Sequence, residues 1–477
     1  MQQAIEIPDI RQYSGITSDS REVEKGYLFA AIPGVAQNGE RYIPQAVERG
    51  ATGILCRKDW QGELPTGVAR IEAENPRHML ALLAEAFYQP SPRHIVAITG
   101  TDGKTSTAEF CRQLLEQTGH KAATLGTLGV HSLHYRAPEG FPNTTPDPVV
   151  LHRHLQALAK TGVDYVALEA SSHGLHQYRL DGVRPEAGVF TTFGADHGDY
   201  HPTTEEYFDA KARLFRELLP AGARAVLNAD DERIMRLAQP CAERGLEVVT
   251  FGRNAKDFRS EKIIPVAEGL LVELNILGKP WEGKLPLYGG FQLMNVLAAS
   301  AAVWPHLQSH EQYFSLLPAL SGVRGRLEKV AVFPQGMPVF VDYAHTAQAL
   351  KGILLALRPH TAGHLLVVFG CGGDRDRAKR PHMGQVAAEL ADLAIITDDN
   401  PRSEDPASIR AEILAACPEG VEIGDREEAI VYALRCMQEG DVLVVAGKGH
   451  ETTQLVGRKS VHFNDAEVIR KNIMEIV

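Results

Sequence analysis

The stretch His94–Thr105, HIVAITGTDGKT, decides the fold of this chain. Its apolar residues Ile95–Ile98 are typical of a buried strand, and the glycine-rich loop Gly100–Thr105 follows almost directly. Apolar residues after Ser106 recur at helical spacing, so we expect the loop to run into a helix. A strand, a glycine loop and a helix N-terminus in this order form a cradle for anions, because the loop N–H groups and the helix dipole converge on one place.

The side chains of this loop suit a nucleotide with a bound magnesium ion. Lys104 can reach terminal phosphates, and the Thr105 hydroxyl can ligate Mg²⁺. The loop is two residues shorter than the general pattern G-x-x-x-x-G-K-[ST], so its sequence alone is weak evidence for nucleotide binding. Its position between a strand and a helix is the stronger evidence. The expected ATP-binding residues of this stretch are Gly100, Thr101, Asp102, Gly103, Lys104, Thr105 and Ser106.

The length of 477 residues exceeds what one hydrophobic core supports and predicts about three domains. We place them at residues 1–88, 89–326 and 327–477. The fold class expected is α/β: a smaller N-terminal α/β domain, a central doubly wound parallel sheet that carries the phosphate loop, and a C-terminal Rossmann-like α/β domain.

Composition and charge exclude several classes of protein. The formal net charge of -11 argues against a nucleic-acid binder. No apolar run approaches the roughly 18 residues of a membrane span, and the N-terminal MQQAIEIPDIRQ lacks the features of a signal peptide, so we expect a cytoplasmic protein. The six cysteines show no C-x-x-C spacing, which favours reduced, mostly buried thiols.

Polar clusters after or between the apolar segments of the first two domains are candidates for chemistry. Glu169 ends the apolar segment 164–168, where a nucleotide-binding enzyme needs a second metal-holding residue; the alternative is an exposed carboxylate at a strand end. The cluster 196–201, DHGDYH, is equally consistent with metal ligands and with a polar loop. Residues 143–147, NTTPD, look first like a helix cap, and residues 17–21, TSDSR, like a solvated turn.

Lys211 is unusual because it lies in an apolar stripe. At helical spacing it shares one face with Tyr207, Leu214 and Phe215. One explanation is that its long side chain extends along the stripe to water. The other is that a desolvated, neutral amine takes up CO₂ and becomes a carbamate that can hold a metal.

The C-terminal third repeats one arrangement four times. Each apolar segment, 338–341, 365–369, 393–397 and 442–445, precedes a glycine-rich or charged loop, which predicts a second α/β sheet with its own polar crevice. No G-x-G-x-x-G pattern follows a strand here, so we exclude a dinucleotide-dependent oxidoreductase.

Ten motifs in a fixed order give the chain a family resemblance from about Thr17 to Asp465. They are TGTDGKTS, NTTPD, LEASSHGL, DHGDYH, YFDAKARLF, GRLE, DYAHT, FGCGGDRD, DNPRSEDP and AGKGHE. In this order they resemble the Mur ligases, and more narrowly the tripeptide-forming branch. DNPR is similar to the form that adds meso-diaminopimelate rather than lysine.

The resemblance implies an ATP-dependent ligase of cytoplasmic peptidoglycan precursor synthesis, which we expect to be a monomer. It would join UDP-MurNAc-L-Ala-D-Glu to meso-diaminopimelate through an acyl phosphate, using Mg²⁺ and a carbamoylated lysine. The implied catalytic residues are Lys104, Glu169, His197 and Lys211, and the implied metal ligands are Thr105, Glu169, His197 and Lys211 as its carbamate.

The resemblance also assigns residues to three binding sites. To the ATP-binding loop it adds Asn295, Arg326, Asp342 and His345. The UDP-muramoyl dipeptide would be held by Ser20, Thr144, Thr145, Ser172, Gln177 and Arg179. The diaminopimelate pocket would consist of Arg375, Asp399, Asn400, Arg402, Gly447 and Glu451.

Three departures from the family pattern leave alternatives open. Asp102 stands where asparagine is usual, the loop 194–198 lacks an expected arginine, and Ala347-Gln348 replace a typical Pro-Asp pair. The rival hypotheses are a lysine-adding or folylpolyglutamate-type ligase, and a paralogue that binds UDP-muramoyl peptides or nucleotide without turnover.

Overall fold

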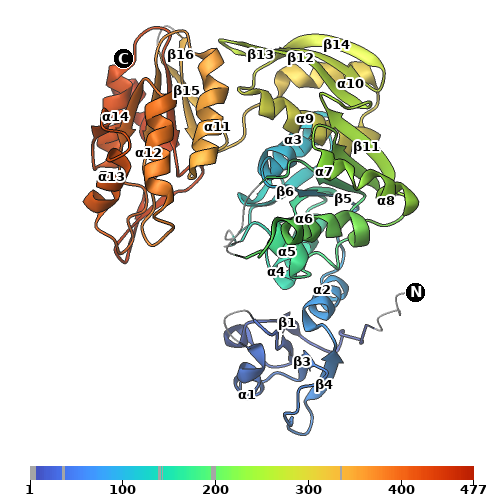
Figure 1. Cartoon of the computed structure of the whole chain (residues 1–477). Helices are drawn as coiled ribbons and strands as arrows, with labels where there is room; N and C mark the ends of the chain where they lie inside the picture. Colours follow the sequence, from blue (N-terminus) through green and yellow to red (C-terminus); the bar gives the residue numbers. More distant parts are fainter. Residues whose placement is uncertain are drawn as a thin grey trace. The chain divides into compact units, whose positions relative to one another are not determined.

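The structure is a computed structural model that describes residues 7–34, 38–137, 141, 143–194, 200–333 and 336–476. The chain forms two compact units (Figure 1). The first contains Met1–Arg259 and Asn295–Ser309, and the second contains Ser260–Met294 and His310–Val477. The expected boundaries at residues 88 and 326 stay a prediction.

The first unit begins with a four-stranded sheet of order β1-β2-β3-β4, in which all neighbours are parallel. Its elements are β1 (Gly15–Thr17), η1 (Ser20–Glu22), β2 (Tyr27–Ala30), η2 (Gly39–Tyr42), α1 (Ile43–Glu48), β3 (Gly53–Arg57), β4 (Ala69–Ala73) and α2 (Pro76–Phe87). α2 starts where it does because the Asn75 side chain accepts hydrogen bonds from the N–H groups of Arg77 and His78, and Pro76 occupies the first helical position.

The central sheet of the first unit has β5 in its middle, paired in parallel with β8 and β9. The order within the first unit is β12-β11-β10-β9-β5-β8-β6-β7, as expected for a doubly wound parallel sheet, and β12 contributes only Phe258 and Arg259 to this unit. The strands are β5 (His94–Thr99), β6 (Ala122–Gly126), β7 (Gly129–Ser132), β8 (Tyr165–Glu169), β9 (Ala187–Phe190), β10 (Arg224–Asn228), β11 (Glu247–Gly252) and β12 (Phe258–Val266). β7 pairs antiparallel with β6, an edge strand that sequence reasoning missed.

Helices cover this sheet and pack on a core of branched and aromatic side chains. They are α3 (Lys104–Gln117), α4 (Pro148–Lys160), α5 (Ser172–His176), α6 (Thr204–Arg213), η3 (Leu214–Leu218), α7 (Glu232–Met235), α8 (Ala238–Glu243), α9 (Gly290–Val303) and η4 (Trp304–His306). The predicted caps of α4 and the predicted apolar face of α6 are confirmed: Asp147 accepts from the Val149 N–H, and Tyr207 and Lys211 are buried.

The second unit contains a six-stranded sheet of order β15-β16-β20-β17-β18-β19. Every predicted strand of the C-terminal third is present, and the sheet is parallel except for the antiparallel pair β15-β16. Its strands are β15 (Glu328–Phe333), β16 (Met337–Asp342), β17 (Leu365–Phe369), β18 (Leu393–Ile396), β19 (Val421–Glu422) and β20 (Val442–Ala446). β16, β17 and β20 are buried along their whole length, as continuous apolar runs in a covered parallel sheet should be.

The remaining elements of the second unit lie before, around and after this sheet. They are β13 (Gly269–Ile276), β14 (Lys279–Leu285), α10 (His310–Leu316), η5 (Leu317–Ala319), α11 (Ala347–Leu357), η7 (Arg358–His360), α12 (Lys379–Leu390), α13 (Pro406–Leu414), α14 (Arg426–Cys436), β21 (Thr453–Val456), β22 (Lys459–His462) and α15 (Asp465–Ile476). Within the described ranges, no helix has both the length and the apolar character needed to cross a membrane.

Candidate functional site

The phosphate loop lies at the carboxyl end of β5, and two of its glycines are required by both conformation and space. Gly100 has φ +148° and Gly103 has φ +84°. A Cβ on Gly100 would lie 1.9 Å from the Thr191 hydroxyl oxygen, and one on Gly103 would lie 2.4 Å from Oδ1 of Asn295. Any larger residue would clash there, so only glycine fits at these two positions.

Helix α3 begins at this loop without the usual side-chain cap. Its N-cap is Gly103, which has no side chain to accept from the first turn, whereas α4 and α6 of the same unit are capped by Asp147 and Thr203. The N–H groups of the first turn of α3 therefore point outward without an acceptor from the cap residue. This is the arrangement that binds phosphate at a helix N-terminus.

Asp102 is anchored by its backbone and exposes its side chain. The Thr191 hydroxyl donates to the Asp102 carbonyl at 2.5 Å, and the Asp102 N–H donates to the Thr192 hydroxyl at 3.0 Å. The residue is exposed in the structure. The carboxylate that departs from the family pattern thus faces solvent at the mouth of the loop, where water screens its charge.

Thr105 and Glu169 form the polar centre of the site. The Thr105 hydroxyl lies 3.0 Å from each carboxylate oxygen of Glu169, which also accepts from the N–H of Thr127 at 2.8 Å and from its hydroxyl at 3.1 Å. Glu169 is 2 % exposed, so it is not the exposed strand-end carboxylate of the alternative interpretation. Gly126 makes room for it, because a Cβ there would lie 2.2 Å from a carboxylate oxygen.

Two lysines meet at one carbonyl of the loop. Lys104 donates to the Gly100 carbonyl at 2.9 Å, and Lys211 donates to the same oxygen at 2.7 Å. Lys211 is 1 % exposed, and its ammonium lies 4.5 Å from the centre of the Tyr207 ring. It therefore does not extend along the helix to water; it ends beside the phosphate loop.

The structure does not describe residues 195–199. The predicted ligand His197 and residues 195–198 of the altered loop therefore lie outside the described residues. The cluster 196–201 is described only at its end. His201 is buried there, with its ring 5.3 Å from that of Tyr207.

The residues expected to hold the UDP-muramoyl dipeptide adjoin Glu169. Thr145 donates to the Glu169 carbonyl at 2.8 Å, and the Thr144 hydroxyl lies 3.0 Å from that of Thr127. Arg179 donates to the Thr145 carbonyl and to the Gln177 amide oxygen, the latter at 2.8 Å. Hydrogen bonds therefore connect these side chains to Glu169, directly or through Thr127 and Thr145.

Two further residues of this set lie on neighbouring elements. The hydroxyl of Ser172 is buried and has no hydrogen-bond partner in the described part of the chain. Ser20 is buried and donates to the Gln45 side chain at 2.8 Å, and the nearby Ser18 reaches Asp147 at 3.3 Å. The segment 17–21 is thus a partly buried contact with the central domain rather than a free solvated turn.

The remaining ATP-binding candidates are divided between the two units. Asn295 lies in the first unit against Gly103, and Arg326, Asp342 and His345 lie in the second. The Asp342 carboxylate accepts from the N–H groups of Leu327 and Ala344 at 2.6 and 2.7 Å, while burial raises its pKa.

Aromatic and backbone groups hold Arg326 and His345. The guanidinium of Arg326 stacks 4.8 Å from the Tyr343 ring centre. His345 shares a hydrogen bond of 2.9 Å through Nδ1 with the Tyr343 carbonyl, and burial lowers its pKa. Arg326 and His345 therefore flank the same tyrosine.

The diaminopimelate candidates form a hydrogen-bonded network in the second unit. Asn400 donates to Glu451 at 3.0 Å and accepts from the Lys448 ammonium at 3.2 Å; Lys448 also donates to Glu451 at 2.9 Å. Burial acts to raise the pKa of Glu451, but the charge and hydrogen bond of Lys448 lower it overall. The carboxylate stays ionised, as a group that binds an ammonium must.

Arg402 occupies a constrained position in the same crevice. Its φ is +50°, and its guanidinium donates to the Gly373 carbonyl at 2.8 Å. A Cβ on Gly372 would lie 2.8 Å from that guanidinium, so this glycine leaves space for the arginine. The carbonyls of Gly373 and Asn400 bind one nitrogen of the Arg402 guanidinium, and its other nitrogens can donate to a ligand.

Asp399, Gly447 and Arg375 complete the predicted set. Asp399 is buried, which raises its pKa, and a Cβ on Gly447 would lie 2.8 Å from its carboxylate. Arg375 is exposed and donates to the Asp374 carbonyl at 3.5 Å. The predicted set therefore combines a buried carboxyl group with an exposed arginine.

Comparison with known proteins decides the family. Residues 12–88 match the catalytic domain of the Mur ligase family, residues 98–303 match the Mur ligase middle domain, and residues 325–449 match the Mur ligase glutamate ligase domain. The chain belongs to the Mur ligase family. The resemblance inferred from the ten motifs is thereby confirmed, as is the α/β fold class.

Two relatives and one solved structure that are similar to this chain carry the same name. Proteins from Brucella melitensis biotype 1 and Caulobacter vibrioides, both named UDP-N-acetylmuramoyl-L-alanyl-D-glutamate--2,6-diaminopimelate ligase, are 47 % and 48 % identical over 96 % and 95 % of this chain and 93 % of each relative. A solved structure of the same name has a TM-score of 0.72 and 32 % identity, covering 97 % of this chain and 95 % of its own.

Sequence reasoning missed several residues that build this Mur ligase site. Thr127 binds Glu169, Thr191 and Thr192 hold the loop backbone, and Lys448 is 0 % exposed at the centre of the Asn400 network. Lys448 stands inside the motif AGKGHE, and a buried lysine between two glycines was an available signal. Isolated threonines gave none, because threonine is common in loops.

Proposed function

We propose that this chain is an ATP-dependent ligase that forms an amide bond between UDP-MurNAc-L-Ala-D-Glu and meso-2,6-diaminopimelate. Relatives that bear the name of this activity are 47 % and 48 % identical over nearly the full length of the chain, which supports this choice of substrates. The observation that carries the proposal is the contact of the Thr105 hydroxyl with both oxygens of Glu169, beside an uncapped helix N-terminus. It joins a phosphate-binding backbone to a buried carboxylate, which is what a Mg²⁺-nucleotide site needs.

The residues present fit a magnesium ion. Thr105 and Glu169 offer three oxygen atoms, because the hydroxyl oxygen of Thr105 lies 3.0 Å from each carboxylate oxygen of Glu169. Hard oxygen donors are the ligands that Mg²⁺ prefers. When bound, the ion would neutralise charge on the β- and γ-phosphates. Thr127 would keep the Glu169 carboxylate in this orientation through hydrogen bonds from its N–H and its hydroxyl.

The reaction follows from bringing two anions together. A carboxylate oxygen of the D-glutamyl residue attacks the γ-phosphorus of ATP, the bond from that phosphorus to the β–γ bridging oxygen breaks, and ADP leaves. Lys104 would move from the loop carbonyls to the phosphates and stabilise the negative charge. The diaminopimelate amine then attacks the acyl carbon, the bond to the phosphate oxygen breaks, inorganic phosphate leaves, and the amine loses a proton.

Lys211 is proposed to act as a carbamate. Its ammonium and that of Lys104 both donate to the Gly100 carbonyl, so two positive charges lie close together in a buried place. Addition of CO₂ to the neutral Lys211 amine, with loss of a proton, would replace one of these charges with a carboxylate. This carbamate, with His197, would hold a second metal ion.

The crevice of the second unit is proposed to select the amino acid. Arg402 would bind the carboxylate at the far end of diaminopimelate by a bidentate pair, and Glu451 would bind the ammonium beside it. Lysine lacks that carboxylate and would leave the guanidinium without a partner, so it would be rejected.

Ser20, Thr144, Thr145, Ser172, Gln177 and Arg179 would hold the UDP-muramoyl dipeptide, and Asn295, Arg326, Asp342 and His345 would contact the nucleotide. The substrates are small molecules of peptidoglycan precursor synthesis, and we place the protein in the cytoplasm as a monomer. The net charge of -11 agrees with a protein that does not bind nucleic acid.

One assay separates this proposal from its rivals. Phosphate release from ATP is measured with UDP-MurNAc-L-Ala-D-Glu and either meso-diaminopimelate or L-lysine. Release with diaminopimelate alone is expected. Release with lysine alone would make this a lysine-adding ligase, and no release with either would favour a binding paralogue. Parallel gel filtration and light scattering test the monomer.

A further inference from the structure

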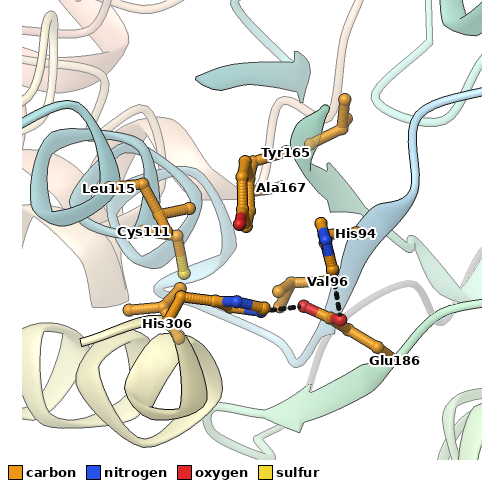
Figure 2. Close-up of a pocket in the computed structure, with 10 residues that line it drawn as sticks. His94, Val96, Cys111, Leu115, Tyr165, Ala167, Glu186 and His306 are labelled. Atoms are coloured by element: carbon orange, nitrogen blue, oxygen red, sulfur yellow. Dashed lines mark hydrogen bonds and ion pairs between the residues drawn. The ribbon is translucent and has the colours of Figure 1, made fainter. Parts of the chain in front are cut away.

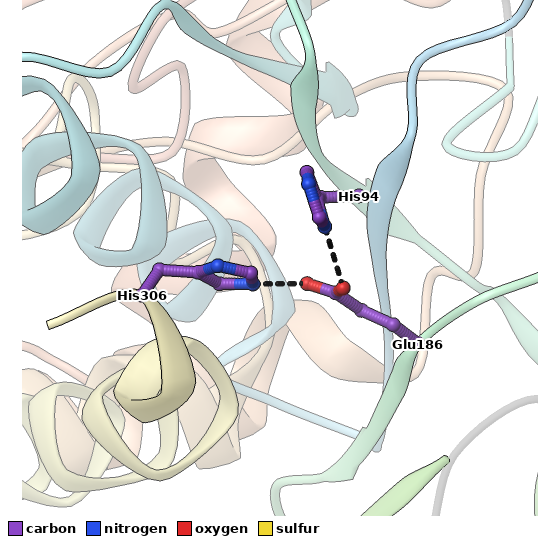
Figure 3. Close-up of side chains that lie close together, drawn as sticks. All are labelled: His94, Glu186 and His306. Atoms are coloured by element: carbon purple, nitrogen blue, oxygen red, sulfur yellow. Dashed lines mark hydrogen bonds and ion pairs between the residues drawn. The ribbon is translucent and has the colours of Figure 1, made fainter. Parts of the chain in front are cut away.

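A second cluster of metal-ligating side chains lies in the first unit, away from the phosphate loop. It consists of His94, the first residue of β5, Glu186, directly before β9, and His306, the last residue of η4 (Figure 3). The phosphate loop follows the carboxyl end of β5, whereas His94 begins that strand. Six strand residues separate the two places by roughly 20 Å, so the cluster is no part of the nucleotide site.

The three side chains point at one another. His94 Nδ1 lies 2.7 Å from one oxygen of Glu186, and His306 Nε2 lies 2.6 Å from the other. The ligand atoms of all three lie within 4.8 Å of each other. In a tetrahedral zinc site with bonds of about 2.0–2.2 Å, neighbouring ligand atoms are roughly 3.4 Å apart, so small side-chain rotations suffice to admit an ion.

Neighbouring rings fix the two imidazoles. The ring of His94 stacks on Tyr165 with centroids 4.5 Å apart, and His306 meets the same ring edge-on at 4.9 Å. Figure 2 shows these residues around a small pocket together with the sulfur of Cys111. Burial raises the pKa of that thiol, so it stays protonated and does not compete as a ligand.

The three candidate ligands are partly exposed, and one of them is an ionised carboxylate. The side chains of His94 and Glu186 are each 31 % exposed and that of His306 is 14 % exposed, so an ion and a water molecule can enter. Burial acts to raise the pKa of Glu186, but the hydrogen bonds from His306 and His94 lower it overall. The ionised carboxylate of Glu186 is thus held between the two histidine rings.

We propose that His94, Glu186 and His306 bind a first-row transition-metal dication, Zn²⁺ foremost, separately from the Mg²⁺ of the ligase reaction. Two imidazole nitrogens favour such ions over Mg²⁺, which prefers oxygen, and three protein ligands leave the fourth position to water. Binding requires the proton on His94 Nδ1 and that on His306 Nε2 to move to the other nitrogen of each ring, so that a lone pair of each imidazole faces the ion. The ion links the start of β5, the segment before β9 and the end of η4.

The test is a Zn²⁺ titration of the full chain in excess Mg²⁺, with calorimetry and a Co²⁺ absorption spectrum as readouts. His306→Gln and Glu186→Gln remove one ligand each. His120→Gln is the matched control, because that ring lies 6.5 Å from the ring of His306 but is not among the three ligands. Glu169→Gln reports whether zinc enters the ligase site instead.

Wild-type protein is expected to bind one zinc ion more tightly than any other. Either ligand variant should weaken this event by at least about tenfold and abolish the tetrahedral Co²⁺ bands, whereas the His120 and Glu169 variants keep both. If His306→Gln does not fold, His94→Gln removes a ligand from a strand instead. Equal zinc affinity in wild type and the folded ligand variants, or loss in Glu169→Gln alone, would overturn the proposal.

Discussion

The hydroxyl of Thr105 lies 3.0 Å from both carboxylate oxygens of Glu169, although 64 residues separate them in the chain. Parallel pairing of β5 and β8 produces this contact, since the register sets Ile98 opposite Glu169. The carboxyl ends of both strands therefore deliver their polar residues to one edge of the sheet.

Glu169→Gln is expected to lower kcat by about a hundredfold or more, because the amide loses the charge that a magnesium ion requires. Steady-state phosphate release at varied Mg²⁺ measures this. Thr105→Ser keeps the hydroxyl and serves as the control, with activity close to wild type. Full activity of the glutamine variant would remove Glu169 from the metal site.

Lys211→Ala should lose nearly all activity, and a short carboxylate such as formate or acetate added with bicarbonate should restore part of it. The carbamate is the functional form in this proposal, so Lys211→Arg, which keeps the charge but cannot be carbamoylated, should stay inactive without rescue. Carbon-13 NMR of protein equilibrated with labelled bicarbonate looks for the adduct directly. An unimpaired alanine variant would end the carbamate hypothesis.

Arg402→Ala should reduce kcat/KM for meso-diaminopimelate by about a hundredfold while changing the KM for ATP little, because only the far carboxylate loses its partner. The ratio of activities with diaminopimelate and L-lysine should fall accordingly. Arg410→Ala, a substitution of an arginine that pairs with Asp398 and Glu422, serves as the control and should keep the ratio. An unchanged ratio in Arg402→Ala would place selection elsewhere.

Asp102→Asn is expected to lower the KM for ATP by only about two- to fivefold. The carboxylate is exposed, so solvent screens most of its repulsion from phosphates, and the loop is held by its backbone rather than by this side chain. ATP titrations at low and high salt measure the effect, which should shrink at high salt. A large gain in kcat would instead mean that Asp102 inhibits the wild-type reaction.

His152 makes the first unit sensitive to acid. The ring is 1 % exposed, neither ring nitrogen has a hydrogen-bond partner among the described residues, and burial lowers its pKa to about 4 from 6.5. The unfolded chain binds this proton first, so the stabilisation is present above pH 6.5 and is lost as the pH falls toward 4, by about 3 kcal/mol.

Denaturant unfolding between pH 4 and 7 tests this assignment. His152→Leu should flatten the profile, whereas the exposed His364→Gln should leave it as in wild type. A profile that is equally steep in His152→Leu would assign the acid sensitivity to other groups.

Much of the fold could be predicted because its signals are local. The run Ile95–Ile98 and the four apolar segments of the C-terminal third become buried strands, since a covered parallel strand is apolar along its length. The edge strands β7 and β15 were missed, because both are partly exposed and β7 carries no continuous apolar run.

The candidate site could be predicted only in part. Glu169 and the glycine loop were found, because a strand end and a helix start mark them in the sequence. Thr127 and Lys448 were not, because their roles depend on partners brought by other strands. The order of motifs located the remaining candidates by family resemblance rather than by physics.

The sequence by itself determined the elements, the phosphate loop and the family of this protein, since apolar periodicity, glycine placement and motif order are written along the chain. Only the tertiary structure decided which distant residues meet. Lys211 reaches the Gly100 carbonyl across 111 positions, and His94 reaches Glu186 across 92. The physical reason is that strand register sets the relative height of each strand and helix packing sets which face of α6 meets the sheet, and neither can be read from local sequence.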